Sequence, residues 1–330
     1  MALSMTANGA NNETLSQIEQ VLGAEIEGLN KNLLNHAKIL KNNDLHIANS
    51  IWINERDDTD IVKKFFEMNL EYYQAEINKE KFNNKTAGKI NGWVDKHTEG
   101  MIKEIINDVH PDSVMYLVNA IAFDAKWEET YAEHQVHNDL FTNHKKDKKE
   151  IKLMQSEENI YLCDGQSIGF VKPYAENKFS FVGILPDNIH QYVSEMTGET
   201  FLNLINSSRR VKVDAYLPKF TYDYGVKMND LLISLGMVDA FDQVKADFSK
   251  MAKTKGENIY IDEVLHKTFI EVDELGTKAA AVTSVGMVAT TATINEERYQ
   301  VKLNKPFIYI IMDNETNWPI FMGTVLDIDK

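Results

Sequence analysis

The chain has 330 residues, of which 43% are hydrophobic and 26% are charged, and its formal net charge is -15 at pH 7. This composition is typical of a globular protein that can bury a large core. The negative charge argues against nucleic acid binding, because phosphate groups require a basic surface. The sequence has no run of about 18 apolar residues, so we expect no membrane-spanning helix. The single cysteine, Cys163, excludes an internal disulfide.

Helical periodicity dominates the first 110 residues. Ile90, Val94 and His97 recur at a spacing of three or four, which is typical of an amphipathic helix. Asn12 suits the N-cap of another helix. Helices are expected at 1–9, 13–22, 26–40, 58–73 and 89–106, and strands at 45–53 and 114–123. Asn119 lies within the second strand, so its amide must find hydrogen-bond partners in the core.

Strand patterns dominate from residue 151 onward. Strands are expected at 151–163, 168–173, 179–185, 211–217, 259–272, 299–303, 307–312 and 320–326, and helices at 190–205 and 226–235. Helices first and strands later, without regular βα alternation, predict an α+β architecture. Neither a repeat nor a Gly-, Pro- or Ser-rich linker is present, which favours one interwoven domain over 1–330.

The stretch 271–294 (EVDELGTKAAAVTSVGMVATTATI) is unusual, because residues 279–294 include no charge, proline or aromatic ring. If it is a strand, Thr277, Ala279, Ala281 and Thr283 share a face that is small enough to be buried, whereas Lys278 lies on the other face. Two interpretations remain open from the residues alone. The stretch is either an ordinary buried strand or loop, or a segment that is exposed in one state and inserted in another.

Candidate catalytic motifs are weak. Gly165 to Gly169 match G-x-S-x-G around Ser167, but an active nucleophile elbow needs a helix directly after the serine. The following residues are strand-like and include Pro173, so a turn between two strands is the favoured interpretation. His134 and His137 lack the helical spacing of a zinc motif. We therefore expect that the protein is not an enzyme and that it binds neither a metal nor a cofactor.

Several motifs, in the same order along nearly the whole chain, resemble those of the serpin family. They are INGWVDKHTEGMIKEII (90–106), LVNAIAFDAKW (117–127), LPKFTYDYGVKMNDLLISLGMVDAF (217–241), ADFSKM (246–251), LHKTFIEVDELGTKAAAVT (265–283), LNKPF (303–307) and PIFMGTVLDI (319–328). The resemblance implies three β-sheets, about eight helices and an exposed reactive-centre loop at about 274–298. It also implies a suicide-substrate inhibitor of serine proteases, whose cleaved loop inserts into the main sheet while the acyl-enzyme is trapped. The alternatives are a non-inhibitory serpin with a binding or chaperone role, and a hydrolase that uses Ser167.

The resemblance also implies roles for individual residues. The hinge would comprise Glu274, Gly276, Thr277, Ala279, Ala280 and Ala281. Counting from Gly276 places the reactive bond at Thr290-Thr291, with Met287, Val288, Ala289 and Ala292 as alternatives if the register slips. Val288, Ala289, Thr290 and Ala292 are small and Met287 is unbranched, which suits an elastase- or subtilisin-like protease with a shallow primary pocket, or a cysteine protease. We expect a monomer that acts in the extracellular space or the cell envelope.

Three further residues match positions that control opening of the main sheet. Asn119 and His266 match the polar shutter of the family, and Trp127 matches the breach where insertion begins. Glu274 matches a hinge residue that normally forms a salt bridge, although the sequence does not identify its partner. MALSMTANGA is similar to the second half of the family's second helix, so the sequence is expected to be truncated at its N-terminus and to lack shutter serines.

Overall fold

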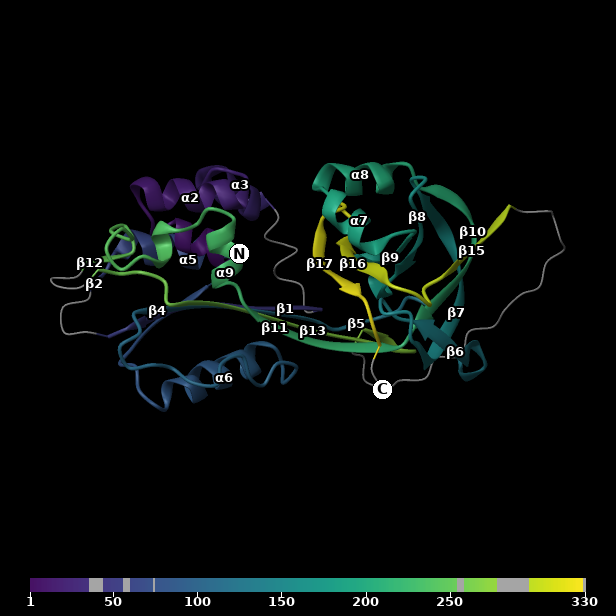
Figure 1. Ribbon diagram of the computed structural model, residues 1–330, viewed down its shortest axis with the longest axis horizontal. Coiled ribbons are helices and arrows are strands. Elements are labelled where there is room, and N and C mark those ends of the chain that lie inside the picture. Colours follow the sequence, from purple (N-terminus) through teal and green to yellow (C-terminus); the bar gives the residue numbers. More distant parts are fainter. Residues whose placement is uncertain (36–43, 56–59, 74, 254–257, 278–296, 329–330) are drawn as a thin grey trace. The chain divides into compact units, whose positions relative to one another are not determined.

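The structure is a computed structural model, and it describes residues 1–330 except 36–43, 56–59, 74, 254–257, 278–296 and 329–330 (Figure 1). The chain divides into two compact units. Unit 1 comprises Met1–Phe123 and Tyr222–Phe269, and unit 2 comprises Asp124–Thr221 and Ile270–Lys330. Each unit is therefore assembled from two separate stretches of sequence.

Unit 1 contains most of the helices. They are α1 (Ala2–Ala7), α2 (Asn12–Leu22), α3 (Ile26–Asn35), α5 (Lys63–Tyr73), α6 (Thr86–His97) and α9 (Asn229–Ser234), with a short 3-10 turn, η3 (Asp239–Phe241). Its strands are β1 (Leu45–Asn54), β2 (Asp60–Ile61), β3 (Glu76–Glu80), β4 (Met115–Phe123) and β12 (Ala252–Lys253). Two longer strands, β11 (Phe220–Lys227) and β13 (Glu263–Val272), begin or end in the other unit.

The central sheet of unit 1 has the strand order β3-β1-β4-β13, and β11 pairs with β13. β1 runs antiparallel to β4, and β4 runs parallel to β13. Apolar clusters cover both faces: one includes Met5 and Phe65 from the helices α1 and α5, and the other includes Ile90 and Val94 from α6. Burial on both faces explains why β4 reads MYLVNAIAF, an almost continuous run of hydrophobic residues.

Unit 2 is built mainly from strands. They are β5 (Ala125–Lys126), β6 (Val136–Thr142), β7 (Lys148–Cys163), β8 (Ser167–Pro173), β9 (Phe179–Pro186), β10 (Arg209–Pro218), β14 (Gly276–Thr277), β15 (Arg298–Lys302), β16 (Phe307–Asp313) and β17 (Pro319–Val325). Its helices are α7 (Ile189–Glu195) and α8 (Gly198–Asn206), with short 3-10 turns at η1 (Glu133–Gln135) and η2 (Ala175–Asn177).

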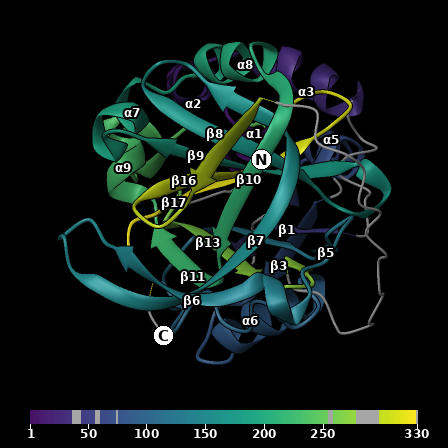
Figure 2. The same ribbon diagram turned by 90° about the vertical axis from the view of Figure 1, so that its right-hand side faces the viewer.

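The large sheet of unit 2 has the order β15-β10-β7-β8-β9-β16-β17, with β6 paired to β7 (Figure 2). Every residue of β9 is buried, because this strand lies between two neighbours and both of its faces are covered. One face packs with Phe201 and Leu204 of α8. On the other face, Phe181 lies near Phe170 and Tyr309, with ring centres 6.3 and 6.4 Å away.

The predicted α+β architecture is confirmed: the described residues form eight α-helices and three sheets, the smallest being the β2-β12 pair. Among these residues, no helix is long and apolar enough to cross a membrane. The prediction of one interwoven domain stays a prediction.

Some predicted element boundaries were wrong. The helix predicted at 89–106 ends at His97, because Glu99 and Gly100 adopt left-handed φ values of 49° and 79°. The apolar residues beyond them continue as an irregular segment in which Ile102 and Ile106 are still buried. The helix predicted at 190–205 is two helices, because the Thr197 side chain caps α8.

Two more boundaries differ near the ends of helices. Asn12 is the first residue of α2, preceded by Asn11 at the N-cap, and its side-chain amide donates to Asp247 at 2.8 Å instead of capping. The segment predicted as a helix at 226–235 begins as strand β11, and α9 spans only Asn229–Ser234. In both cases contacts with residues distant in sequence override the local pattern.

Candidate functional site

The residues just before 278–296 form a short strand in unit 2. Thr277 of β14 pairs with Val272 at the end of β13, and Gly276 and Thr277 pair on their other side with Lys126 and Ala125 of β5. A Cβ at Gly276 would lie 2.1 Å from the carbonyl oxygen of Ala125, so only glycine fits there. The predicted hinge residues Gly276 and Thr277 thus already have a strand on each side.

A tight turn connects β13 to this hinge strand. The carboxylate of Asp273 accepts hydrogen bonds from the backbone N–H groups of Leu275 and Gly276 at 2.8 and 3.2 Å. The Asp273 N–H donates to the carbonyl oxygen of Gly276 at 3.0 Å. Since the side chain and the backbone of one aspartate close the turn together, the direction in which the chain leaves β13 is set locally.

Trp127, predicted at the breach, contacts this turn. Its indole N–H donates to the carbonyl oxygen of Asp273 at 2.9 Å, and its backbone N–H donates to the carbonyl oxygen of Leu275 at 3.0 Å. The buried ring stacks on Tyr174, with ring centres 4.5 Å apart and an interplanar angle of 12°. Trp127 therefore positions the backbone of the turn that precedes Gly276.

Tyr174 extends these contacts to the hinge strand itself. Its hydroxyl lies 2.7 Å from the hydroxyl of Thr277, and both side chains are fully buried. Burial raises the pKa of the Tyr174 hydroxyl, so it stays neutral and can donate or accept this hydrogen bond. The Thr277 side chain consequently faces the interior of unit 2, as the sequence alternation predicts for this face of the strand.

The partner of Glu274, which the sequence did not identify, is Lys219, the residue directly after β10. The Lys219 ammonium lies 2.8 and 2.6 Å from the two carboxylate oxygens. Partial burial opposes ionisation of Glu274, but the hydrogen bonds and charge of Lys219 outweigh it, so the pKa of this carboxyl lies below its usual value. Glu274 therefore ties the turn to β10 by a charged pair.

A second charged pair lies under the aromatic rings and was missed in the sequence. Lys172 of β8 contacts Glu158 of β7 at 2.9 Å, and their side chains are 3% and 7% exposed. The Lys172 ammonium also lies 4.5 Å from the ring centre of Tyr131 and 5.4 Å from that of Trp127. Burial raises the pKa of Glu158, whereas the Lys172 charge and the Ser156 hydroxyl oppose that rise.

Removal of one member of this buried pair should be strongly destabilising. Lys172→Met leaves the Glu158 carboxylate buried without its cation, so we expect the free energy of unfolding to fall by about 3–5 kcal/mol. The double variant Lys172→Met, Glu158→Leu removes both charges and should recover most of the loss. The measurement is urea unfolding at pH 7.5.

An exposed pair supplies the control for this experiment. Lys63 and Glu67 are separated by one helical turn and lie 3.3 Å apart, with side chains 89% and 59% exposed. Lys63→Met should change the free energy of unfolding by less than about 1 kcal/mol. If Lys172→Met changed the free energy of unfolding as little as Lys63→Met does, the buried pair would not hold this region together.

In unit 1, the predicted shutter residues meet across three adjacent strands. Asn49, Asn119 and His266 lie opposite one another in register on β1, β4 and β13. The Asn119 amide donates to the side-chain oxygen of Asn49 at 2.7 Å, and its own oxygen lies 2.5 Å from Nδ1 of His266. Because that oxygen can only accept, the proton is on Nδ1 of His266. The sequence predicted the contact between Asn119 and His266, whereas the role of Asn49 was missed.

The shutter histidine should make stability depend on pH. Burial lowers the pKa of His266 below its usual value. A proton is therefore taken up more readily by the unfolded chain, and stability should fall as the pH drops below about 6.5, the usual pKa of histidine. His266→Gln should lose this pH dependence of stability while keeping a side-chain donor to Asn119. The measurement is the difference in unfolding midpoint between wild type and variant at pH 7.5 and pH 5.5; an identical difference at both pH values would contradict this expectation.

Several predicted site residues lie outside the described residues. They are the hinge residues Ala279, Ala280 and Ala281, the predicted reactive bond Thr290-Thr291, and its alternatives Met287, Val288, Ala289 and Ala292. Of the predicted hinge residues, Glu274, Gly276 and Thr277 lie within the described part of the chain.

The G-x-S-x-G motif is a turn between two strands. Ser167 is the first residue of β8, and its buried hydroxyl donates to Asp164 at 3.0 Å. Gly165 has a left-handed φ of 88°, and a Cβ at Gly169 would lie 2.5 Å from the carbonyl oxygen of Gly183. Strand geometry thus explains both glycines, and the helix required by a nucleophile elbow does not follow Ser167.

Comparisons with known proteins agree with this fold. The model of the serpin (serine protease inhibitor) family matches residues 1–328. Human Serpin B8 is 32% identical over 98% of this chain and 89% of its own length. An uncharacterized serpin-like protein of Methanosarcina mazei is 29% identical over 98% of this chain and 78% of its own length.

A thermophilic serpin, tengpin, has been solved in two states. Its native-state structure is 51% identical to this chain, with a TM-score of 0.93, covering 99% of this chain and 86% of tengpin. Its latent-state structure gives a TM-score of 0.84 at 49% identity, covering 99% of this chain and 89% of tengpin. Serpins include both extracellular and intracellular proteins, so an extracellular location stays a prediction. The match over residues 1–328 places this chain in the serpin family.

Proposed function

We propose that this protein inhibits serine proteases by the suicide-substrate mechanism. Serpins are typically protease inhibitors and not catalysts, although some have no inhibitory role. The target protease would cleave the loop and form an acyl-enzyme. The freed loop would then enter the sheet between β4 and β13 before the acyl-enzyme is hydrolysed.

The hinge strand is the observation that carries this proposal. β4 and β13 pair directly, from Tyr116 opposite Glu263 to Ala122 opposite Phe269. Beyond this ladder, at the C-terminal end of β13, Gly276 and Thr277 are already paired as the first two residues of a further strand. Insertion would extend this short strand along β13, so its starting point would already be in place.

Extending the observed register supports the proposal. Val272 pairs with Thr277, so each further loop residue would meet the preceding residue of β13. Six positions on, Thr283 would meet His266, which itself lies opposite Asn119. The inserted strand would thus separate the two shutter residues with a small side chain that can form hydrogen bonds.

The residue types of the loop also favour insertion. Thr277 is buried, and Ala279, Ala281 and Thr283 would follow on the same face of an extended strand. Small uncharged side chains on that face can enter the interior without burying a charge. This pattern favours an inhibitor over a non-inhibitory serpin.

The residues near the predicted bond suggest the class of target. Thr290 and Thr291 are small, and so are the neighbouring Ala289 and Ala292. A protease with a shallow or small primary pocket, of the elastase or subtilisin kind, would accept them, and a cysteine protease with a similar pocket is also compatible. We expect the inhibitor to act as a monomer that contacts the protease through this loop.

Incubation with elastase-like and subtilisin-like proteases tests the mechanism. We expect a protease–serpin complex that survives denaturing gel electrophoresis, with loss of protease activity at about one serpin per protease. Mass spectrometry of the released peptide should place the cut between Thr290 and Thr291. Simple cleavage of the loop without a complex would support a binding role instead, and esterase activity lost in Ser167→Ala would support a hydrolase.

A pair of loop variants tests insertion. Thr283→Arg would place a charge on the buried face beside His266, so insertion should slow and the protein should become a substrate, with complex yield reduced at least tenfold. Ser284→Arg places the same charge on the opposite face and serves as the matched control, with a smaller expected loss. Equal complex yields from the two variants, measured on denaturing gels, would contradict the proposed register.

A further inference from the structure

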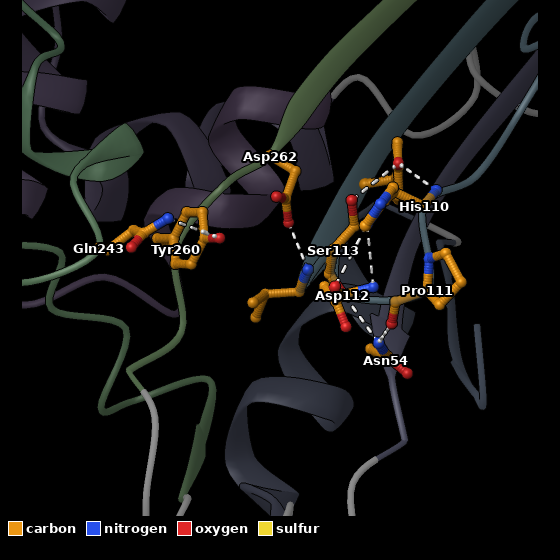
Figure 3. A network of polar contacts seen from close by, with 10 residues as sticks. Asn54, His110, Pro111, Asp112, Ser113, Gln243, Tyr260 and Asp262 are labelled. Carbon is orange, nitrogen blue, oxygen red and sulfur yellow. Dashed lines mark hydrogen bonds and ion pairs between the residues drawn. The ribbon is translucent and has the colours of Figure 1, made fainter. Parts of the chain in front are cut away.

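A polar cluster ties the beginning of β4 to the residue before β13 in unit 1 (Figure 3). The carboxylate of Asp262 accepts hydrogen bonds from the backbone N–H groups of Val114 and Met115, the latter at 3.0 Å. The backbone N–H of Asp262 donates to the carbonyl oxygen of Met115 at 3.1 Å. These three contacts, which we term the Asp262 clasp, close the end of the β4-β13 pair opposite the hinge.

Both sides of the clasp are fixed by neighbouring residues. On the β4 side, the amide of Asn54 donates to the carbonyl oxygen of Ser113 at 2.7 Å (Figure 3). On the β13 side, the side chain of Asn229 donates to the carbonyl oxygen of Asp262 at 2.6 Å and accepts from the N–H of Val264 at 3.0 Å. A shift of either side would therefore disturb hydrogen bonds beyond the clasp itself.

The clasp differs in kind from the ladder between β4 and β13. A strand inserted between them would replace each ladder hydrogen bond with a similar backbone bond on either side. The bonds to the Asp262 carboxylate have no such replacement, and a charged acceptor forms stronger hydrogen bonds than a carbonyl group does. Asp262 is also half-buried, so water compensates only part of the loss.

The register locates the point at which the clasp must open. From Val272 opposite Thr277, ten positions along the loop bring Met287 to Asp262. A new strand moves its neighbours apart by about 4.8 Å, which is too far for the clasp to persist. The predicted bond at Thr290 lies only three residues beyond Met287, so the clasp would oppose the last part of insertion and not its start.

We propose that Asp262 is a positioning residue that keeps the far end of the β4-β13 pair closed until the loop has inserted almost completely. This inference rests on the proposed inhibitory function. It assigns to Asp262 a contribution to the stability of the uncleaved form that is absent from the cleaved, inserted form. A purely structural aspartate would stabilise both forms equally.

The test compares Asp262→Asn in uncleaved protein and in protein cut within 278–296 by a protease of low specificity. Thermal unfolding is followed in a fixed concentration of guanidinium chloride, chosen so that the midpoints of both forms fall within the measurable temperature range. In the uncleaved form we expect the midpoint to fall by about 4 °C, because the amide keeps the shape of the carboxylate but not its charge. In the cleaved form we expect a change below about 1 °C. Asp262→Ser is the second variant, for use if the first does not fold.

Asp242→Asn is the matched control. Asp242 also accepts two backbone N–H bonds, from Val244 and Lys245 at 2.8 and 2.9 Å, but within a local turn of unit 1. Its replacement should change the midpoints of both forms by the same amount. Equal shifts in both forms for the Asp262 variants, or no shift in either, would overturn the role of Asp262.

The wild-type protein separates this failure from failure of the proposed function. If cleavage raises the wild-type midpoint, insertion occurs, and the behaviour of the Asp262 variants decides the inference by itself. If cleavage does not raise the wild-type midpoint and no protease complex forms, the proposed function fails and the role of Asp262 fails with it.

Discussion

The direct pairing of β4 with β13 is the constraint on which the rest of the structure depends. Parallel pairing satisfies the backbone groups along the facing edges of the two strands from Tyr116 to Ala122, so an inserted strand must first break that ladder. Each broken bond can be replaced on either side of a new strand, which leaves the backbone satisfied in both states. In the proposed mechanism, such a sheet would be stable when closed and would still accept one more strand.

In the proposed mechanism, polar side chains at particular points of this sheet would control how it opens. Asn119 and His266 are hydrogen-bonded across the β4-β13 pair, where an apolar pair would pack without any directional preference. Buried polar groups must keep their partners, so separation of the strands at this point requires a replacement for each one. If the loop inserts as proposed, a loop residue able to form hydrogen bonds would be favoured at this point over one that cannot.

The two ends of β13 are held by different chemistry. At its end, aromatic rings and ion pairs hold the turn into the hinge: Trp127 bonds to the turn backbone, and Lys219 pairs with Glu274. At its beginning, Asp262 bonds directly to backbone N–H groups at the start of β4. In the proposed mechanism, the hinge end would present a strand that has already begun, whereas the other end would remain closed. Insertion would accordingly proceed in one direction along β13.

The sequence by itself determined that β4 is a buried strand and that Thr277 lies on a buried face. Continuous hydrophobic residues predict β4, and alternation predicts the buried face of Thr277, because both patterns depend only on neighbouring positions. Partners distant in the chain were decided by the tertiary structure. Lys219 and Glu274 are 55 residues apart, and Lys172 and Glu158 meet because β7 and β8 pair in a particular register. Periodicity reports that a side chain is buried, but the sheet register decides which charge it meets.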